Sequence, residues 1–221
     1  VYSVDAESGE ERWGLITDSS VKNSVAVDHR GIGAAVSIAG QVYGFEVGSG
    51  AVVWRQKLPM HPERWIYTRP AVVDGTVYAG AKAGYGAYDL GTGEQLWYSS
   101  LTPHRGFSDR VGEGWGSYAS PQVYGGMLIL LLNARALAAL DRRDGTIGWE
   151  QPLDVMHYYA NPALAGDLLV TGGSFEHLAV RSAETGEVRW HEPVLNAQYP
   201  TNLLVEGQRV YVTTNQGSVR C

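Results

Sequence analysis

The sequence is poor in cysteine, in clustered basic residues and in long apolar runs. Cys221 is the only cysteine among 221 residues, so no disulfide can form within the chain. The longest aliphatic run, Met127 to Leu132, has six residues, whereas a membrane-spanning helix needs about 20. The net charge is −6 and no basic cluster is present, which argues against a surface that neutralises nucleic-acid phosphates. We therefore expect no nucleic-acid partner and no transmembrane segment in this chain.

Motifs of common catalytic and metal sites are also missing. No Gly-x-Ser-x-Gly, His-Glu-x-x-His or Cys-x-x-Cys occurs. The glycine-rich pieces Gly31–Gly33 and Gly84–Gly86 are not followed by a helix that could bind phosphate. His61, His104 and His157 recur at similar distances after tryptophans, but ligands on separate repeats rarely converge on one ion. We expect no catalytic or metal-ligating residues in this chain.

A nine-residue pattern recurs along the whole chain. Its fullest copy runs from Asp89 to Trp97 and reads Asp-Leu-Gly-Thr-Gly-Glu-Gln-Leu-Trp. The other copies, each with a glycine four residues before a tryptophan, are Asp5 to Trp13, Glu46 to Trp54, Asp141 to Trp149 and Ser182 to Trp190. Successive tryptophans of the pattern are 41, 43, 52 and 41 residues apart. A spacing in this range indicates a repeat architecture.

Each repeat also contains short apolar runs separated by turn residues. Pro70 to Val73 leads through Asp74-Gly75 to the run Thr76 to Ala79, a third run ends at Tyr88, and the motif supplies the fourth. Glycine accepts the positive φ that tight hairpin turns require, and no stretch has helical periodicity. The repeat therefore predicts a four-stranded antiparallel sheet, which is the blade of an all-β propeller.

The repeat boundaries predict a single β-propeller region over residues 1–221. Its parts are a partial blade 1–20, full blades at about 21–60, 61–104, 118–155 and 158–195, and a partial blade 198–221. Val1 to Val4 and Ser218 to Cys221 align with the same strand of the repeat, so a ring closed by these ends would duplicate that strand. We therefore expect a fragment of a seven- or eight-bladed propeller, and the start at Val1 favours the same reading. A closed five-bladed ring is the alternative.

The tryptophan and the glycine of the motif are interpreted as structural. A single blade is stable only between neighbours, and a tryptophan side chain can cover about 150–250 Å² of such an interface. Glycine permits a positive-φ turn and the close approach of the next blade. The blade-docking residues are expected to be Trp13, Trp54, Trp97, Trp149 and Trp190 with Gly9, Gly50, Gly93, Gly145 and Gly186.

The stretch Ala87-Tyr-Asp-Leu-Gly-Thr-Gly-Glu-Gln-Leu-Trp97 resembles the tryptophan-docking motif of pyrroloquinoline-quinone (PQQ) type propellers, Ala-x-Asp-x-x-Thr-Gly-x-x-x-Trp. The resemblance covers essentially the whole chain, with one strong copy and four degenerate ones. No Trp-Asp dipeptide is present, which argues against the WD40 class. The family contains quinoprotein dehydrogenases, typically of eight blades, and non-catalytic members such as an outer-membrane-assembly lipoprotein and propellers attached to kinases.

The resemblance also implies what a dehydrogenase of this family would bring. Such an enzyme has a vicinal cysteine disulfide over the quinone, a Ca²⁺ held by Glu and Asn, and an Asp base. Cys221 stands alone here, and no Glu, Asn or Asp lies in a matching context. We therefore expect no cofactor, with PQQ and calcium expected only if the chain is a piece of a quinoprotein dehydrogenase.

A candidate binding face lies where each repeat begins. Tyr67, Tyr118, Tyr159 and Tyr199 share one repeat position, and the polar residues Arg69, Ser120 and Asn161 share another two residues later. The first strands of propeller blades line the central channel, so such positions converge at its mouth. The insertion Tyr98 to Gly116 adds Phe107 and Trp115, since long loops often carry binding residues. Two alternatives remain open: the tyrosines pack between blades, and the insertion caps the channel.

The sequence thus favours a non-catalytic PQQ-like propeller module that acts as a protein- or ligand-binding scaffold within a larger protein. The expected partner is a protein, a glycan or a small molecule at the channel mouth. The alternatives are a fragment of a PQQ-dependent dehydrogenase and a sensor propeller appended to a kinase or phosphoesterase. The resemblance alone implies an extracytoplasmic location, which is periplasmic, secreted or membrane-tethered.

Overall fold

The computed structural model describes residues 1–59, 68–81, 84–101, 119–132, 136–153, 161–173, 177–193 and 200–221. In these residues every regular element is a β-strand, which confirms the all-β fold class. No described segment forms a helix long and apolar enough to cross a membrane. The chain divides into two compact units, unit 1 (Val1–Gly116) and unit 2 (Ser117–Cys221).

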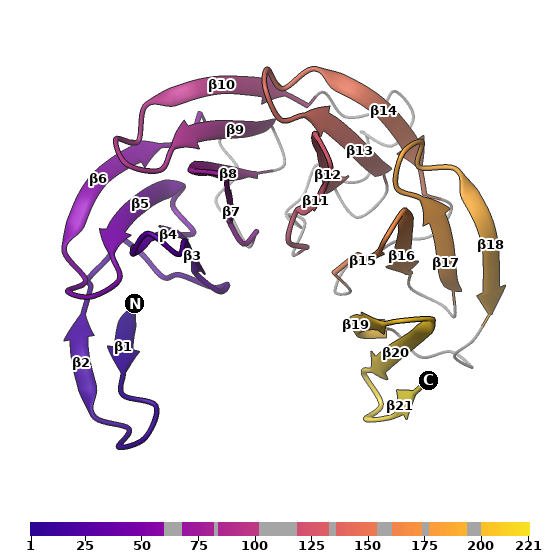
Figure 1. Ribbon diagram of the computed structural model, residues 1–221, viewed down its shortest axis with the longest axis horizontal. Helices are drawn as coiled ribbons and strands as arrows, with labels where there is room; N and C mark the ends of the chain where they lie inside the picture. The colour runs from indigo at the N-terminus through magenta and orange to yellow at the C-terminus, as the bar shows by residue number, and fades with distance from the viewer. Residues whose placement is uncertain are drawn as a thin grey trace. The chain divides into compact units, whose positions relative to one another are not determined.

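The described part of unit 1 contains one two-stranded sheet and two four-stranded sheets, all antiparallel. The strands follow chain order within each sheet (Figure 1). The first sheet is β1 (Tyr2–Val4) and β2 (Glu11–Gly14). The second is β3 (Ala26–Val27), β4 (Ile32–Val36), β5 (Gln41–Glu46) and β6 (Val52–Lys57). The third is β7 (Ala71–Val73), β8 (Thr76–Ala81), β9 (Gly84–Asp89) and β10 (Gln95–Ser100).

Unit 2 repeats the same antiparallel plan in two four-stranded sheets and one three-stranded sheet among its described residues. The first is β11 (Gln122–Tyr124), β12 (Met127–Leu132), β13 (Ala136–Asp141) and β14 (Ile147–Pro152). The second is β15 (Ala163–Ala165), β16 (Leu168–Gly172), β17 (His177–Ser182) and β18 (Val188–Pro193). The third is β19 (Pro200–Glu206), β20 (Arg209–Thr214) and β21 (Val219–Arg220). The first strands lie side by side, since β11 contacts β15 and β15 contacts β19.

The strand limits differ from the sequence expectation at both edges of a sheet. Strands β7, β11 and β15 begin one residue after a proline, because proline has no N–H to donate to the ladder. At the other edge, β10 continues past Trp97 to Ser100. The insertion expected to start at Tyr98 therefore starts after this strand, and the Tyr98 hydroxyl donates a hydrogen bond of 3.1 Å to the Pro59 carbonyl.

The third and fourth strands of each four-stranded sheet, and likewise β1 and β2, pair with a register shift next to the motif. The shift lies between Gly44 and Phe45 in one sheet and between Gln95 and Trp97 in another. Beside it, each motif tryptophan faces a residue of the third strand that is small in four of the five copies. The pairs are Trp13–Ser3, Trp54–Gly44, Trp97–Ala87, Trp149–Ala139 and Trp190–Val180. An added Cβ at Gly44 would overlap the Trp54 indole, so the small partner leaves room for the ring.

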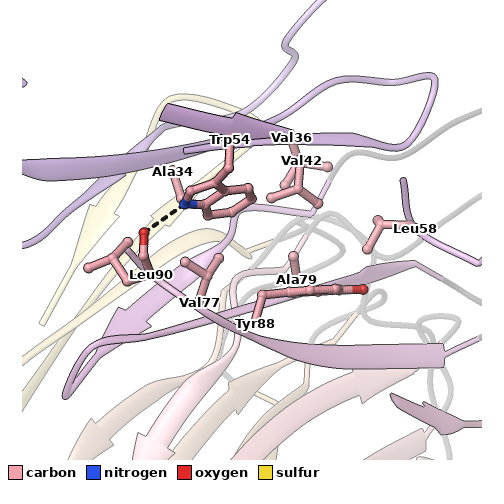
Figure 2. Packing of buried hydrophobic residues seen from close by; sticks show 9 residues of the cluster. All are labelled: Ala34, Val36, Val42, Trp54, Leu58, Val77, Ala79, Tyr88 and Leu90. Carbon is pink, nitrogen blue, oxygen red and sulfur yellow. Dashed lines mark hydrogen bonds between the residues drawn. The ribbon is translucent and has the colours of Figure 1, made fainter. Parts of the chain in front are cut away.

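Apolar side chains fill the space between successive sheets of a unit. In unit 1, Trp54 lies between two neighbouring sheets, as Figure 2 shows. One sheet contributes Ala34, Val36 and Val42, and the next contributes Val77, Ala79, Tyr88 and Leu90. In unit 2, buried leucines of β12 and β13 pack in the same way against Leu169 and Ala183 of the following sheet. The core is therefore a series of layers between sheets, which is the packing that a repeat architecture requires.

Candidate functional site

The acidic residue that opens the motif is used to close a turn. In the fullest copy, the backbone N–H groups of Gly91 and Thr92 donate to Asp89 Oδ1 over 2.9 and 2.8 Å. The Asp89 carbonyl accepts the N–H of Gly93 at 2.8 Å. The hydrogen bonds from the Thr92 backbone and hydroxyl lower the pKa of Asp89. The Asp89 carboxylate therefore serves as the hydrogen-bond acceptor that holds the turn together.

The equivalent acids of other copies are fixed in the same way, with an arginine added. The Arg12 side chain beside Asp5, followed by the Ser8 and Glu7 N–H groups, lowers the pKa of Asp5 to about 2. The Arg143 side chain and backbone N–H lower the pKa of Asp141 to about 2. An acid held ionised by a turn and an arginine is suited to structure rather than to proton transfer near neutral pH.

Asp141→Asn should reduce the pH dependence of stability in acid. The folded pKa of Asp141 is about 2, below its ordinary value of 3.8, so its stabilisation is fully present above about pH 4 and is lost as the pH falls to about 2. In thermal unfolding followed by circular dichroism, the variant should melt below the wild type at pH 6 and level with it at pH 2. Glu184→Gln, an exposed carboxylate in the next motif turn, serves as control. A melting difference of equal size at both pH values would contradict this role.

The motif tryptophan of one sheet covers the motif glycine of the next. The Trp13 indole lies against Gly50 and donates from Nε1 to the Val47 carbonyl at 2.9 Å. Trp54 lies against Gly93 and donates to the Leu90 carbonyl at 2.7 Å (Figure 2). In both pairs the acceptor is the residue directly after the motif acid.

In unit 2, the packing of the motif tryptophan on the motif glycine differs from copy to copy. Trp149 covers Gly186, but its buried Nε1 has no hydrogen-bond partner among the described residues. Gln151 covers the same glycine and donates to the Thr185 carbonyl at 3.1 Å. Trp190 is 45% exposed, against 7% for Trp54. The five motif glycines all have positive φ, from 72° for Gly50 to 75° for Gly93 and Gly145.

Three of the nine residues of the candidate binding face lie in the described part of the chain. Ser120 and Asn161 are half-buried, and Arg69 is exposed. The Ser120 backbone N–H donates to Asn161 Oδ1 at 2.7 Å, which links the starts of β11 and β15. Arg69 belongs to unit 1. The other six residues, Tyr67, Phe107, Trp115, Tyr118, Tyr159 and Tyr199, lie outside the described residues.

The sequence reasoning missed a second polar cluster at the start of the second sheet. The Asp18 backbone N–H donates to the Tyr43 hydroxyl at 2.7 Å, and that hydroxyl lies 3.0 Å from Asp18 Oδ1. Burial opposes ionisation of Asp18, but hydrogen bonds from Ser37 and Tyr43 outweigh it and lower the Asp18 pKa. The Arg55 guanidinium lies 5.6 Å from the Tyr43 ring centre. These contacts hold the segment after β2 against the second sheet. The sequence does not repeat these residues in the other blades, so the repeat pattern does not predict the cluster.

No group of three or more His, Cys, Asp or Glu side chains in the described part of the chain could hold a metal ion. Cys221 is exposed and is the only cysteine in the sequence, so the chain contains no vicinal cysteine pair.

The comparison with protein families decides the family. The model of the family described as outer membrane protein assembly factor BamB, a PQQ-like repeat family, matches residues 1–161 and 133–221. The chain belongs to this PQQ-like family. The resemblance of its motif to the PQQ-type propellers is thereby confirmed. No curated protein matches the chain significantly.

Solved structures similar to this PQQ-like chain are β-propellers of several kinds. BamB from Moraxella catarrhalis aligns with a TM-score of 0.60 and 19% identity, over 99% of this chain and 77% of that one. Quinohemoprotein alcohol dehydrogenase from Comamonas testosteroni aligns with a TM-score of 0.71 and 12% identity, over 91% of this chain and 41% of that one. The Myceliophteria thermophila Swd1 β-propeller domain aligns with a TM-score of 0.66 and 14% identity, over 91% of this chain and 64% of that one. At these identities the alignments show the propeller fold, and the chain spans less than half of the dehydrogenase.

Proposed function

We propose that this chain is a non-catalytic PQQ-like β-propeller module that binds a protein partner as a scaffold within a larger protein. The observation that carries the proposal is the family match, which extends over the whole chain and is to an outer membrane protein assembly factor. The motif acids support it, because their carboxylates are engaged in turns.

The proposed binding surface of unit 2 is the polar rim at the starts of β11 and β15, defined by Ser120 and Asn161, and Arg69 before β7 is proposed as a separate binding position of unit 1. The hydrogen bond between Ser120 and Asn161 supports this choice, because it brings the polar positions of two repeats together. Arg69 is exposed and can donate several hydrogen bonds to carbonyl or carboxylate oxygens of a partner. Such groups suit an extended peptide segment, whose backbone carbonyls are unpaired. We further propose an extracytoplasmic location and no resident cofactor.

Peptides selected from a random phage-displayed library on the 221-residue chain should test this function. For a selected peptide, Asn161→Ala in unit 2 or Arg69→Ala in unit 1 should weaken the Kd measured by fluorescence anisotropy by about fivefold or more, which corresponds to about 1 kcal/mol. Arg209→Ala is the control. This exposed arginine begins β20 and lies beside the last residue of β19, at the end of that strand away from the rim. If the selected peptides bound all three variants as tightly as the wild type, the proposed binding positions would be wrong.

A second arm tests the enzymatic alternative. PQQ is titrated into the chain with and without Ca²⁺ and followed by its absorbance. The proposal predicts no saturable change in either case. A saturable, Ca²⁺-dependent change would instead favour a fragment of a quinoprotein dehydrogenase.

A further inference from the structure

The outer strand of the third sheet, β10, differs from the outer strands of the other four-stranded sheets. Among the described strands, β6, β10, β14 and β18 each pair on one side only and are edge strands (Figure 1). Proteins commonly block the unpaired backbone of an edge strand with charged residues or proline. Such residues are Arg55 and Lys57 in β6, Glu150 and Pro152 in β14, and Arg189, Glu192 and Pro193 in β18. β10 reads Gln-Leu-Trp-Tyr-Ser-Ser and contains neither kind.

The backbone groups of Tyr98 and Ser100 point away from the sheet. The Asp89 N–H donates at 2.8 Å to the carbonyl of the residue before β10, and the backbone groups of successive strand residues point to opposite sides. Every second residue of β9 before Asp89 therefore faces β10, and these residues pair with Trp97 and Ser99. Tyr98 and Ser100 consequently direct their N–H and C=O groups to the open edge.

The position of Ser100 is blocked in the other three outer strands. Three residues after the motif tryptophan, those strands carry Lys57, Pro152 and Pro193. Proline has no N–H to offer to a further strand, and a lysine on an edge opposes pairing through its charge. Ser100 is exposed and keeps its N–H. Of the four outer strands, β10 is therefore the one whose edge is open at this position.

The side chains of β10 are suited to pairing with an identical strand. Leu96 is 53% exposed, and Gln95 and Ser100 are exposed as well. Pairing with an identical strand doubles every charge at the contact, and like charges opposite each other across two strands are unfavourable. In β6, Arg55 and Lys57 would meet a second pair of cations. β10 brings no charge to such a contact, so its charge pattern favours a second copy of itself.

We propose that two copies of this chain associate through their β10 strands, which pair antiparallel and join the two sheets into one. Pairing centred on Ser99 places Tyr98 of one copy opposite Ser100 of the other, so that the outward N–H and C=O groups of both residues form hydrogen bonds. The contact is isologous and closes at two copies. Because the paired strands are short, the dimer belongs to the class of weak, transient contacts.

Sedimentation equilibrium of the 221-residue chain, at concentrations up to about 1 mM, tests the association. A reducing agent is present because Cys221 is exposed. The wild type should show a monomer–dimer equilibrium. Ser100→Pro gives β10 the residue that β14 and β18 have at this position, and should weaken the dimer about tenfold or more, because each copy loses a hydrogen bond. Ser100→Ala keeps the N–H and should associate like the wild type. Circular dichroism melting shows whether each variant is folded.

Hydrogen exchange of the wild-type backbone amides locates the contact without any variant, and decides if Ser100→Pro does not fold. Protection of the Tyr98 and Ser100 amides should rise with protein concentration. The control is the amide of Arg55, which follows the motif tryptophan of β6 as Tyr98 follows that of β10, and its protection should stay constant.

Three results would overturn the proposal. The first is a wild-type chain that remains monomeric over the whole concentration range. The second is a folded Ser100→Pro chain that associates like the wild type. The third is protection of the Tyr98 and Ser100 amides that does not depend on protein concentration and appears only when a selected library peptide is added, since an extended partner segment would then occupy the edge.

Discussion

Trp54→Ala should lower the free energy of unfolding by about 3–5 kcal/mol, the range for large aromatic side chains removed from a core. The Trp54 side chain is 7% exposed and packs between two sheets of unit 1. Its loss also leaves the Leu90 carbonyl without the indole N–H that now donates to it at 2.7 Å. Denaturant unfolding followed by far-ultraviolet circular dichroism measures the change.

The control for this prediction is Trp190→Ala, measured under the same conditions. Trp190 occupies the same motif position but is 45% exposed, so its removal should cost clearly less, about 1 kcal/mol. Equal losses for the two variants would show that burial between sheets does not determine the contribution of the motif tryptophan.

Gly93→Ala should destabilise by about 2–5 kcal/mol although it adds a single methyl group. Gly93 has a φ of 75°, and a left-handed conformation costs an alanine about 1–2 kcal/mol. The new Cβ would also lie 2.6 Å from the Trp54 ring, well inside the carbon–carbon optimum of about 3.5–4.0 Å. Relieving this overlap costs about 1–3 kcal/mol more. The same unfolding measurement determines the sum.

Gly9→Ala separates the two contributions. Gly9 has a φ of 74°, but nothing lies within 4 Å of an added Cβ. Only the backbone strain of about 1–2 kcal/mol should therefore be observed. If Gly9→Ala and Gly93→Ala destabilised equally, backbone strain would explain the motif glycine and the tryptophan contact would contribute nothing.

The turn residues between neighbouring strands made the sheets predictable from the sequence. Asp74 and Gly75 have positive φ values of 50° and 78°, and Val73 pairs with Thr76 across them. This is the type I′ hairpin that an Asp-Gly pair between apolar runs predicts. The motif glycines likewise have the positive φ expected of them. These features depend on neighbouring residues, so the sequence is sufficient to predict them.

Features that depend on distant residues were not predictable in the same way. The acceptor of the Trp54 N–H is a carbonyl 36 residues away, and any backbone carbonyl could have filled that place. The hydrogen bond between Ser120 and Asn161 spans 41 residues, and only the repeat period hints at it. Six of the nine proposed binding residues lie outside the described residues, so the binding face remains a proposal.

A double-mutant cycle on Trp54 and Gly93 tests most directly whether the motif is a docking contact between successive sheets. Unfolding free energies are measured for the wild type, Trp54→Ala, Gly93→Ala and the double variant. With the indole absent, Gly93→Ala should cost only its backbone strain, about 1–2 kcal/mol, which gives a coupling energy of about 1–3 kcal/mol. A Gly93→Ala cost that is the same with and without the Trp54 side chain would contradict the account.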